Sequence, residues 1–327
     1  MTIPAKRLVS LSSNALRRSG SHNELPKFTH KIAELYEIPA VSDQYVKEKY
    51  CLYNYIGHGA EGSVMIAEEK ITKREVAIKM VLRRMNCKYE QQQMMSILTE
   101  TRIQSMVSHP AIPAVLEVCR DSKYIYIVQE YAAGETLFEI LHDEKILSME
   151  LCKSIVGQLL ELLDRLHSAG IVHGDIKPEN IIYNPMTNRI YLVDFGSATV
   201  VNSHLSGVTG GSLGYMAPEL IRGAEPSTKT DMWAVGVLLY ILVTGYPPFF
   251  SDSGFRANSD LLLNAPFWYF FNQDTNNLKK EILDCRVDYS HVPPVCANIT
   301  MRILETNSYS RLSAKQALLH PWFVTKQ

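Results

Sequence analysis

The stretch His173–Asn180 reads HGDIKPEN, and it decides the fold that we expect for the whole chain. A carboxylate (Asp175), an ammonium group (Lys177) and a carboxamide (Asn180) lie there close together in sequence. Groups of this kind suit chemistry that needs positioned charge. A short polar motif also arises by chance in a chain of 327 residues, so the motifs on either side of it have to decide.

A glycine-rich turn precedes this stretch. Residues 57–64 read GHGAEGSV and follow an apolar approach that ends at Ile56. The glycines predict a tight turn between two strands, where backbone amides can approach a triphosphate without a Cβ in the way. Farther along, VAIK ends at Lys79, and its alternating apolar positions are typical of a strand.

Further motifs follow His173–Asn180. They are Asp194-Phe195-Gly196, Ala217-Pro218-Glu219, Asp231-Met232-Trp233 and Arg311. In order and spacing, the whole set resembles the eukaryotic protein kinase family from about Tyr50 to Phe323. Lys177-Pro178-Glu179 resembles the serine/threonine type, and the GYPPFF and DCRVDYS segments resemble the calcium/calmodulin-dependent kinase group.

The resemblance implies an α+β fold, the bilobal protein kinase fold. It has a small antiparallel β lobe with one long helix and a larger, mainly helical lobe. Residues 1–49 are expected to form a partly disordered N-terminal extension, and residues 50–327 the kinase domain, with its lobes at about 50–131 and 132–323. We expect strands near Tyr53 and over residues 63–69, 75–81, 114–119 and 124–129, and helices over residues 90–107 and 151–169.

The resemblance also implies the site residues. Asp175 and Lys177 are the implied catalytic residues: the first orients the substrate hydroxyl and the second steadies the γ-phosphate of ATP. Asn180 and Asp194 are the implied ligands of Mg²⁺, with Mn²⁺ as an alternative. Glu100 is implied to hold Lys79 against the α- and β-phosphates. The implied ATP-binding set is Ile56, Gly57, His58, Gly59, Ala60, Glu61, Gly62, Ser63, Val64, Ala77, Lys79, Glu100, Glu130, Ala132 and Ile182.

The resemblance also implies an ion pair between Glu219 and Arg311 and contacts of Ser212 with Asp175 and Lys177. Glu219 is expected to form a buried ion pair with Arg311, which is costly to break from one side. Ser212 stands where the family has a threonine that touches both Asp175 and Lys177.

Gln104 and Gln129 align with two family positions that are neighbours in the kinase fold. Two buried amides that face each other can satisfy each other's hydrogen bonds. We therefore predict a hydrogen bond between them. The alternative is that each finds a backbone partner or solvent.

One departure from the pattern concerns regulation. Gly174 stands where the family has an arginine that grips an activation-loop phosphate, so we expect activity to depend little on such a phosphate. Thr199, Ser203, Ser206 and Thr209 remain available for phosphorylation.

The sequence also suggests two alternatives to an active serine/threonine kinase. Gly174 and the acidic Glu61 at the turn motivate a nucleotide-binding pseudokinase scaffold. The Ala217–Glu219 and Asp231–Trp233 segments, which build the platform for protein substrates, argue against a small-molecule kinase of related fold.

Composition agrees with a large globular domain. The chain is 46% hydrophobic with a net charge of −1, which argues against a nucleic-acid partner and leaves protein substrates. Its six cysteines show no CxxC pattern, as reduced thiols in the cytoplasm or nucleus would. The longest apolar runs, such as residues 233–243, are too short to span a bilayer.

The N-terminal extension differs from the rest. No acidic residue occurs before Glu24, whereas serines and basic residues cluster there. That composition favours a disordered tail that other kinases can phosphorylate, with a mitochondrial transit peptide as a minor alternative. Residues 32–50 are expected to form a helical or docked lead-in.

An aromatic run distinguishes the larger lobe. Phe267–Phe271 reads FWYFF in a segment longer than in minimal kinases. It either packs against the larger lobe or offers a docking surface to a substrate or regulator.

Overall fold

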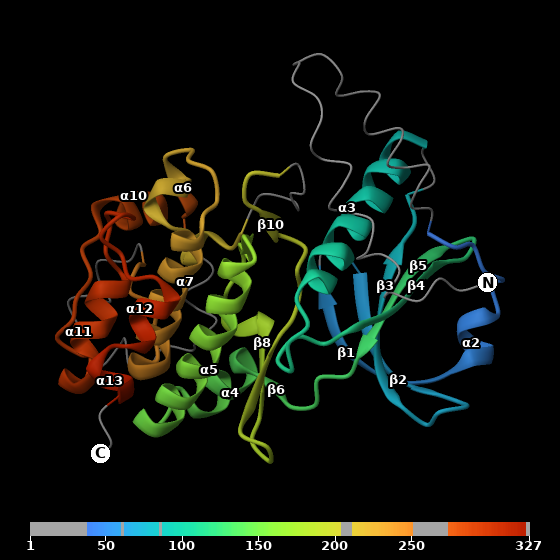
Figure 1. The fold of residues 1–327 in the computed structure, drawn as a ribbon, viewed down its shortest axis with the longest axis horizontal. Coiled ribbons are helices and arrows are strands. Elements are labelled where there is room, and N and C mark those ends of the chain that lie inside the picture. Colours follow the sequence, from blue (N-terminus) through green and yellow to red (C-terminus); the bar gives the residue numbers. More distant parts are fainter. Residues whose placement is uncertain (1–37, 60–61, 85–86, 204–210, 251–273, 325–327) are drawn as a thin grey trace. The chain divides into compact units, whose positions relative to one another are not determined.

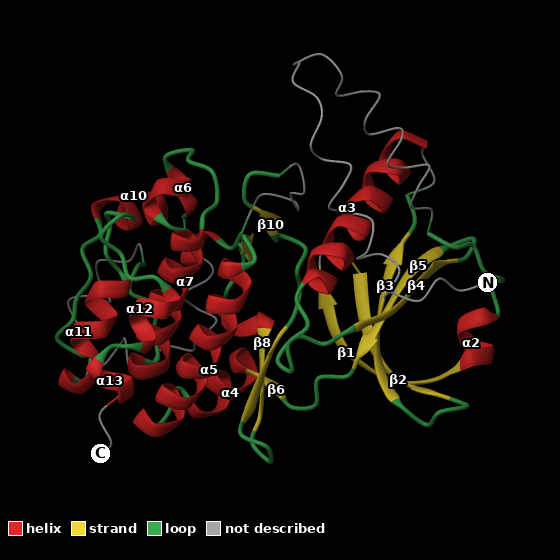
Figure 2. Ribbon diagram, viewed as in Figure 1, coloured by secondary structure: helices red, strands yellow, loops and turns green. Residues whose placement is uncertain are grey.

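The computed structural model describes residues 38–59, 62–84, 87–203, 211–250 and 274–324 (Figure 1). The chain divides into two compact units, Met1–Ala132 and Ala133–Gln327. The first unit is built on strands and the second mainly on helices (Figure 2). Several predicted features lie outside the described residues: the tail up to residue 37, Ala60, Glu61, Ser206, Thr209 and Phe267–Phe271.

The first unit contains a five-stranded antiparallel sheet in the order β1-β2-β3-β5-β4. The strands are β1 (Tyr50–Gly59), β2 (Gly62–Glu69), β3 (Glu75–Leu82), β4 (Val115–Arg120) and β5 (Tyr124–Glu130). All five predicted strands are confirmed. β1 and β2 pair up to Gly59 and Gly62, so the glycine-rich segment falls between two paired antiparallel strands, as predicted.

Alternation along these strands gives the sheet two different faces. Val81, Ile125 and Ile127 form one apolar cluster together with Ile97 of the helix α3 (Cys87–Met106). We call this side the α3 face. Val76 and Ile78 belong to a separate cluster on the opposite side. Lys79 and Gln129 are in phase with Val81 and Ile127, so they stand on the α3 face.

The long helix α3 begins earlier than the predicted residue 90, at Cys87. Its most buried side chains are Ile97, Glu100, Thr101, Ile103 and Gln104. Three of these are polar. The helix therefore depends on polar contacts as well as apolar packing for its position on the sheet.

The predicted lead-in is confirmed for residues 38–49. Ile38 is buried, Ala40 forms a parallel bridge with Arg120, and α2 (Tyr45–Lys49) follows. The segment joins the sheet at β4, which is an edge strand. An added segment of this kind covers backbone groups that an edge would otherwise expose.

The second unit is organised around α7 (Thr228–Thr244), which is buried on every side. Its other helices are α4 (Leu137–Glu144), α5 (Met149–Ser168), α6 (Pro218–Ile221), α10 (Thr275–Asp284), α11 (Pro294–Ile303), α12 (Ala314–Leu318) and α13 (Pro321–Val324). The helix predicted over residues 151–169 is α5. Ser148 caps it, and Leu159, Leu162 and Leu166 lie on its buried side.

Short strands flank the sequence motifs of this unit, such as His173–Asn180 and Asp194-Phe195-Gly196. They are β6 (Glu135–Thr136), β7 (Ile171–Val172), β8 (Ile181–Asn184), β9 (Arg189–Leu192) and β10 (Thr199–Val200). Two 3₁₀ turns, Pro178–Asn180 and Leu213–Tyr215, complete the framework. The chain leaves the His173–Asn180 stretch along β8 and returns along β9 to Asp194. Because β8 and β9 are paired, Asn180 and Asp194 lie at the same end of this hairpin.

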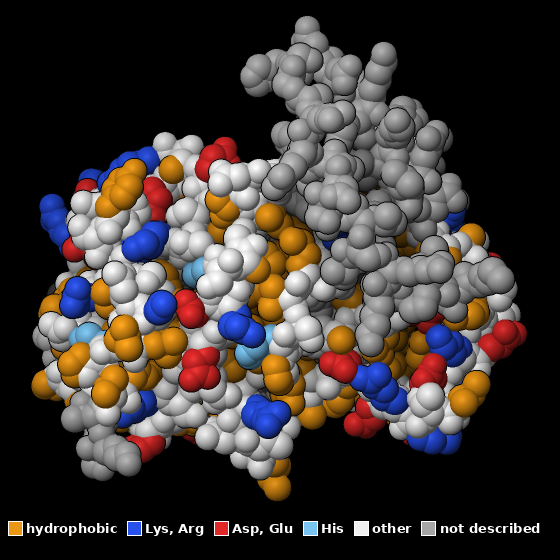
Figure 3. Space-filling model, in the orientation of Figure 1, with side chains coloured by type: hydrophobic (Ala, Val, Ile, Leu, Met, Phe, Trp, Pro, Cys, Tyr) orange, Lys and Arg blue, Asp and Glu red, His pale blue; other side chains and the backbone are white. Residues whose placement is uncertain are grey.

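The surface is of mixed charge. On the face in Figure 3, basic and acidic side chains are interspersed with apolar ones. Within the described ranges, we find no helix with the length and apolarity needed to cross a membrane.

Candidate functional site

Lys79 and Glu100 are paired in the first unit, as predicted. Lys79 Nζ lies 3.0 Å from Glu100 Oε1, and the two side chains are 15% and 7% exposed. Lys79 comes from the middle of β3, and Glu100 comes from the buried side of α3. The carboxylate therefore fixes a lysine ammonium in a place where few water molecules compete for it.

The glycine-rich turn lies on the same sheet. Val64 of β2 pairs with Lys79 of β3, so the turn and the lysine are linked by backbone register. A Cβ on Gly62 would meet the carbonyl oxygen of Met80 at 2.2 Å. Only glycine allows β2 to begin this close to β3.

The predicted hydrogen bond between the two glutamines is confirmed. Gln104 Nε2 donates to Gln129 Oε1 at 3.1 Å and to the carbonyl oxygen of Pro113 at 2.7 Å. Gln104 is 5% exposed. One buried amide thus ties α3 both to β5 and to the chain segment before β4, one helical turn from Glu100.

A double-mutant cycle tests this pair. Gln104→Leu should lower the free energy of unfolding by about 1–3 kcal/mol, because it removes the donor to both Gln129 Oε1 and the Pro113 carbonyl. Gln129→Leu should lower it by less, because Gln104 Nε2 keeps its bond to Pro113. The double variant should lose at least about 0.5 kcal/mol less than the sum of the two. Urea unfolding measures all three, with Gln92→Leu on the exposed side of α3 as the control. Additive effects would show that the amides do not cooperate.

Asp175, Lys177 and Asn180 form one hydrogen-bonded group in the second unit. Lys177 Nζ lies 2.7 Å from Asp175 Oδ2. Asn180 Nδ2 donates to the same Oδ2 at 3.0 Å and to the Asp175 carbonyl at 2.8 Å. Burial acts to raise the pKa of Asp175, but its hydrogen bonds from Lys177 and the Ser212 amide hold that pKa below the usual value. Asp175 is therefore a charged, oriented acceptor at neutral pH.

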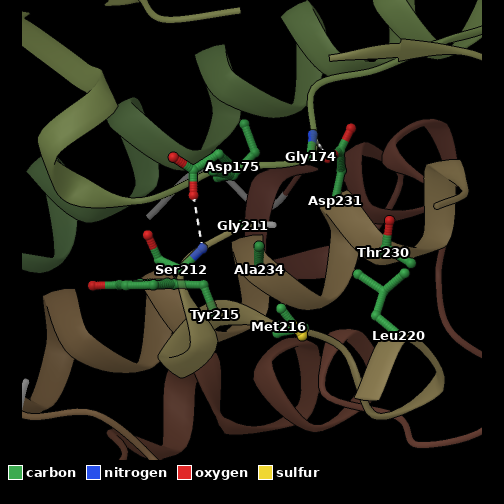
Figure 4. A pocket seen from close by; sticks show the side chains of 11 residues that line it. Gly174, Asp175, Gly211, Ser212, Tyr215, Met216, Leu220, Thr230, Asp231 and Ala234 are labelled. Carbon is green, nitrogen blue, oxygen red and sulfur yellow. Dashed lines mark hydrogen bonds between the residues drawn. The ribbon is translucent and has the colours of Figure 1, made fainter. Parts of the chain in front are cut away.

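Ser212 contacts both predicted partners through different groups. Its hydroxyl accepts from Lys177 Nζ at 2.9 Å. Its backbone N–H donates to Asp175 Oδ1 at 3.0 Å, the bond drawn in Figure 4. Residues 211–216 thereby lie against the His173–Asn180 stretch. A small pocket opens between them and α7. It is lined by Gly174, Asp175, Ile176, Gly211, Ser212, Tyr215, Met216, Leu220, Thr230, Asp231 and Ala234.

Gly174 has a structural reason for being glycine in this chain. Its φ is 78°, in the left-handed region, and a Cβ there would meet the carbonyl oxygen of Ser197 at 2.7 Å. Gly211 approaches from another direction, where a Cβ would lie 2.5 Å from the carbonyl oxygen of Gly174. Glycine adopts this conformation without strain, so the segments that contain Gly174, Ser197 and Gly211 can approach one another closely.

Asp231 has a role that the sequence did not reveal. Its carboxylate accepts hydrogen bonds from the backbone amides of His173 and Gly174 and contacts His167 Nε2, each at 2.9 Å. Burial acts to raise the pKa of Asp231, but the contacts with His167, His173 and the Gly174 amide together lower it. One buried charge on α7 thus fixes the backbone next to Asp175. The signal was present: an aspartate in an otherwise apolar helix needs partners.

Asp194 follows β9 with a φ of 62°, and its Oδ1 accepts from the Gly196 amide at 3.2 Å. Aspartate adopts this left-handed conformation more readily than most residues. Phe195 is fully buried and packs edge-on against His173, with ring centroids 4.9 Å apart. Burial lowers the pKa of His173, which favours the neutral ring in this contact.

The predicted ion pair between Glu219 and Arg311 is confirmed. Arg311 NH1 and NH2 donate to the two carboxylate oxygens of Glu219 at 2.6 and 3.0 Å. The arginine is 0% exposed and also lies over the ring of Trp233. This pair joins α6 to the segment before α12 and supports the residues that line the pocket.

Other residues of the implied ATP set fall in both units. Ile56 is 45% exposed on β1, Ala77 and Ala132 are buried, and Glu130 ends β5, where it contacts Arg74. Ile182 lies in β8 of the second unit, paired with Thr136 and Tyr191. One expectation is wrong: Thr199 of β10 pairs with Val172 of β7 and is only 8% exposed, so it is not accessible for phosphorylation.

Comparisons with known proteins agree with this arrangement. The model of the protein kinase domain matches residues 50–323. The chain is 34% identical over 285 residues to a probable myosin light chain kinase of Dictyostelium discoideum, covering 84% of this chain and 83% of the relative. It is 30% identical to calcium/calmodulin-dependent protein kinase type 1B of Rattus norvegicus, over 91% of this chain and 78% of the relative. It is 31% identical to the Aurora kinase of Schizosaccharomyces pombe, over 82% of this chain and 70% of the relative.

Proposed function

The chain belongs to the protein kinase family, and on that premise we propose which of its residues carry the reaction. It is an ATP-dependent serine/threonine kinase that acts on proteins and uses a divalent metal. Asp175 accepts the proton of the substrate hydroxyl, and Lys177 neutralises charge on the transferred phosphate. The observation that carries this proposal is the group formed by Asp175, Lys177 and Asn180, which Ser212 joins.

The chemistry matches these two roles. Phosphoryl transfer asks little covalent chemistry of a protein and depends on positioning and charge. Asp175 is held by three hydrogen-bond donors in one orientation, with a depressed pKa. A charged carboxylate in a fixed place can orient a hydroxyl for attack and take its proton as the new bond forms.

We propose that Asn180 and Asp194 hold Mg²⁺, with Mn²⁺ as a substitute. The donor set fits, because carboxylate and amide oxygens are the ligands that these hard ions prefer. Nδ2 of Asn180 is engaged with Asp175, and neither of those bonds uses its Oδ1. When bound, the ion neutralises charge on the phosphates of ATP.

In the first unit, we propose that Lys79 binds the α- and β-phosphates and that Glu100 keeps it in position. The ion pair at 3.0 Å supports this assignment. The turn from Gly57 to Val64 would cover the phosphates with backbone amides. Ala77, Glu130 and Ala132 belong to the same unit and would also contribute to ATP binding, and we propose Ile182 of the second unit as a further ATP-binding residue.

We also propose a cytoplasmic or nuclear location. In the part of the chain that the structure describes, Cys51, Cys119, Cys152, Cys285 and Cys296 are free thiols. Free thiols are typical of reducing compartments.

A peptide-array assay tests the proposed reaction. Labelled γ-phosphate should be transferred to serine and threonine peptides in the presence of Mg²⁺, and Asp194→Ala should remove at least about 99% of that rate, as loss of a charge-stabilising group does. Asp143→Ala on the exposed side of α4 is the control. A parent protein that binds ATP yet labels nothing with either metal would contradict the proposal.

A further inference from the structure

We propose that residues 38–49, which precede the matched kinase domain, are a positioning element for α3, and that Ile38 is its central residue. By holding α3 on the sheet, Ile38 keeps Glu100 within reach of Lys79. This inference rests on the role proposed above for that ion pair. It assigns a task in catalysis to a segment outside the family's own domain.

The first observation is where Ile38 is buried. The residue is 2% exposed and belongs to the apolar cluster of Val81, Ile97, Ile125 and Ile127. Met94 and Leu98 of α3 pack against the same cluster. The side chain of Ile38 therefore contributes to the packing between the helix and the sheet.

The second observation is a backbone clamp that fixes Ile38 in this place. The Val41 amide donates to the Arg120 carbonyl at 2.8 Å, and the Arg120 amide donates to the Pro39 carbonyl at 2.9 Å. Arg120 Nε also donates to the carbonyl of Ile38 at 3.1 Å. Three hydrogen bonds to one residue of β4 hold the segment against the edge of the sheet.

The third observation is an anchor at the other end of the segment. Glu117 accepts hydrogen bonds from Tyr45 at 2.7 Å, Tyr50 at 3.0 Å and Lys49 at 2.7 Å. Burial acts to raise the pKa of Glu117, but these donors lower it, so the carboxylate stays charged. Val46 and Tyr50 pack in the cluster on the opposite face. The segment thus passes around β4 from the α3 face to the other face.

The link from Ile38 to Glu100 is the helix itself. Ile97 and Glu100 are three residues apart, which places them on the same side of α3. Ile97, with Met94 and Leu98, attaches α3 to this cluster, so loss of packing around Ile38 weakens the attachment at a point close to Glu100. A helix moves as a unit, and displacement at Ile97 would lengthen the contact between Glu100 and Lys79.

Point variants in the full chain test the inference. Ile38→Ala should lower kcat/KM for ATP by about tenfold, equal to about 1.4 kcal/mol of barrier. Ile38→Val removes one methylene and should cost about twofold to threefold. Ile71→Ala is the matched control, because Ile71 is 90% exposed. Hydrogen exchange of the α3 amides should rise in the order parent, Ile38→Val, Ile38→Ala.

The rates are measured at a temperature where circular dichroism shows each variant fully folded. A role in stability alone would lower the melting temperature but leave kcat and KM within twofold of the parent, and this result would overturn the inference. If Ile38→Ala does not fold, Ile38→Val decides by the same criteria. Failure here leaves the proposed function intact, because an active parent with an inert Asp194→Ala variant tests that separately.

Discussion

Lys79→Met is expected to lower the rate of phosphotransfer to serine and threonine peptides by at least about 100-fold to 1,000-fold. Methionine keeps most of the length of lysine and removes its charge. The ammonium that lies 3.0 Å from Glu100 would be lost, and with it the cation proposed for the α- and β-phosphates. Initial rates with labelled ATP measure the effect. Lys73→Met is the control, because that lysine is 69% exposed in the turn between β2 and β3.

Asp175→Asn extends the same prediction to the second unit. Asparagine fills the same space but cannot take a proton from the substrate hydroxyl. We expect an equal or larger loss of rate, with circular dichroism unchanged. A variant at either position that keeps more than about a tenth of the parental rate would remove that residue from the proposed mechanism.

Glu219→Gln should be the most destabilising of the predicted changes. Arg311 is 0% exposed and cannot lose its proton, so without the carboxylate it becomes a buried charge with no counter-ion in this pair. Removing one partner of such a pair costs about 3–5 kcal/mol. Denaturant unfolding measures the loss. Glu225→Gln, at an exposed position before α7, is the control.

A loss below about 1 kcal/mol for Glu219→Gln would contradict this prediction. It would mean that the carbonyl oxygens of Glu305 and Lys229, which also accept from Arg311, stabilise the guanidinium without Glu219. The pair would then behave like an ordinary surface salt bridge.

Much of the site could be predicted because its residues occupy positions to which the resemblance to the protein kinase family assigns roles. Lys79 stands in an apolar strand, and Glu100, Gln104 and Gln129 align with family positions near it, where buried polar groups need partners. Lys79 with Glu100, Gln104 with Gln129 and Glu219 with Arg311 met as expected. In each pair at least one partner is buried, so its polar groups need contacts within the protein.

Other contacts could not be predicted, because the residues that make them are ordinary for their surroundings. Ile38 is an ordinary apolar residue beside a serine-rich tail, and nothing in its type distinguishes it from the exposed Ile71. Thr199 looked like a modification site until β10 placed it against Val172. Tyr45 and Glu117 are common surface residues that meet because the chain passes around β4.

The sequence by itself determined the family, the strands and the identity of the charged groups, because motif spacing and alternation are local properties of the chain. The tertiary structure alone decided which ordinary residues those groups depend on. Asp231 holds the backbone beside Asp175, and Ile38 packs with the helix that carries Glu100. Such contacts join residues far apart in sequence, and burial and packing select them only when the whole chain has folded.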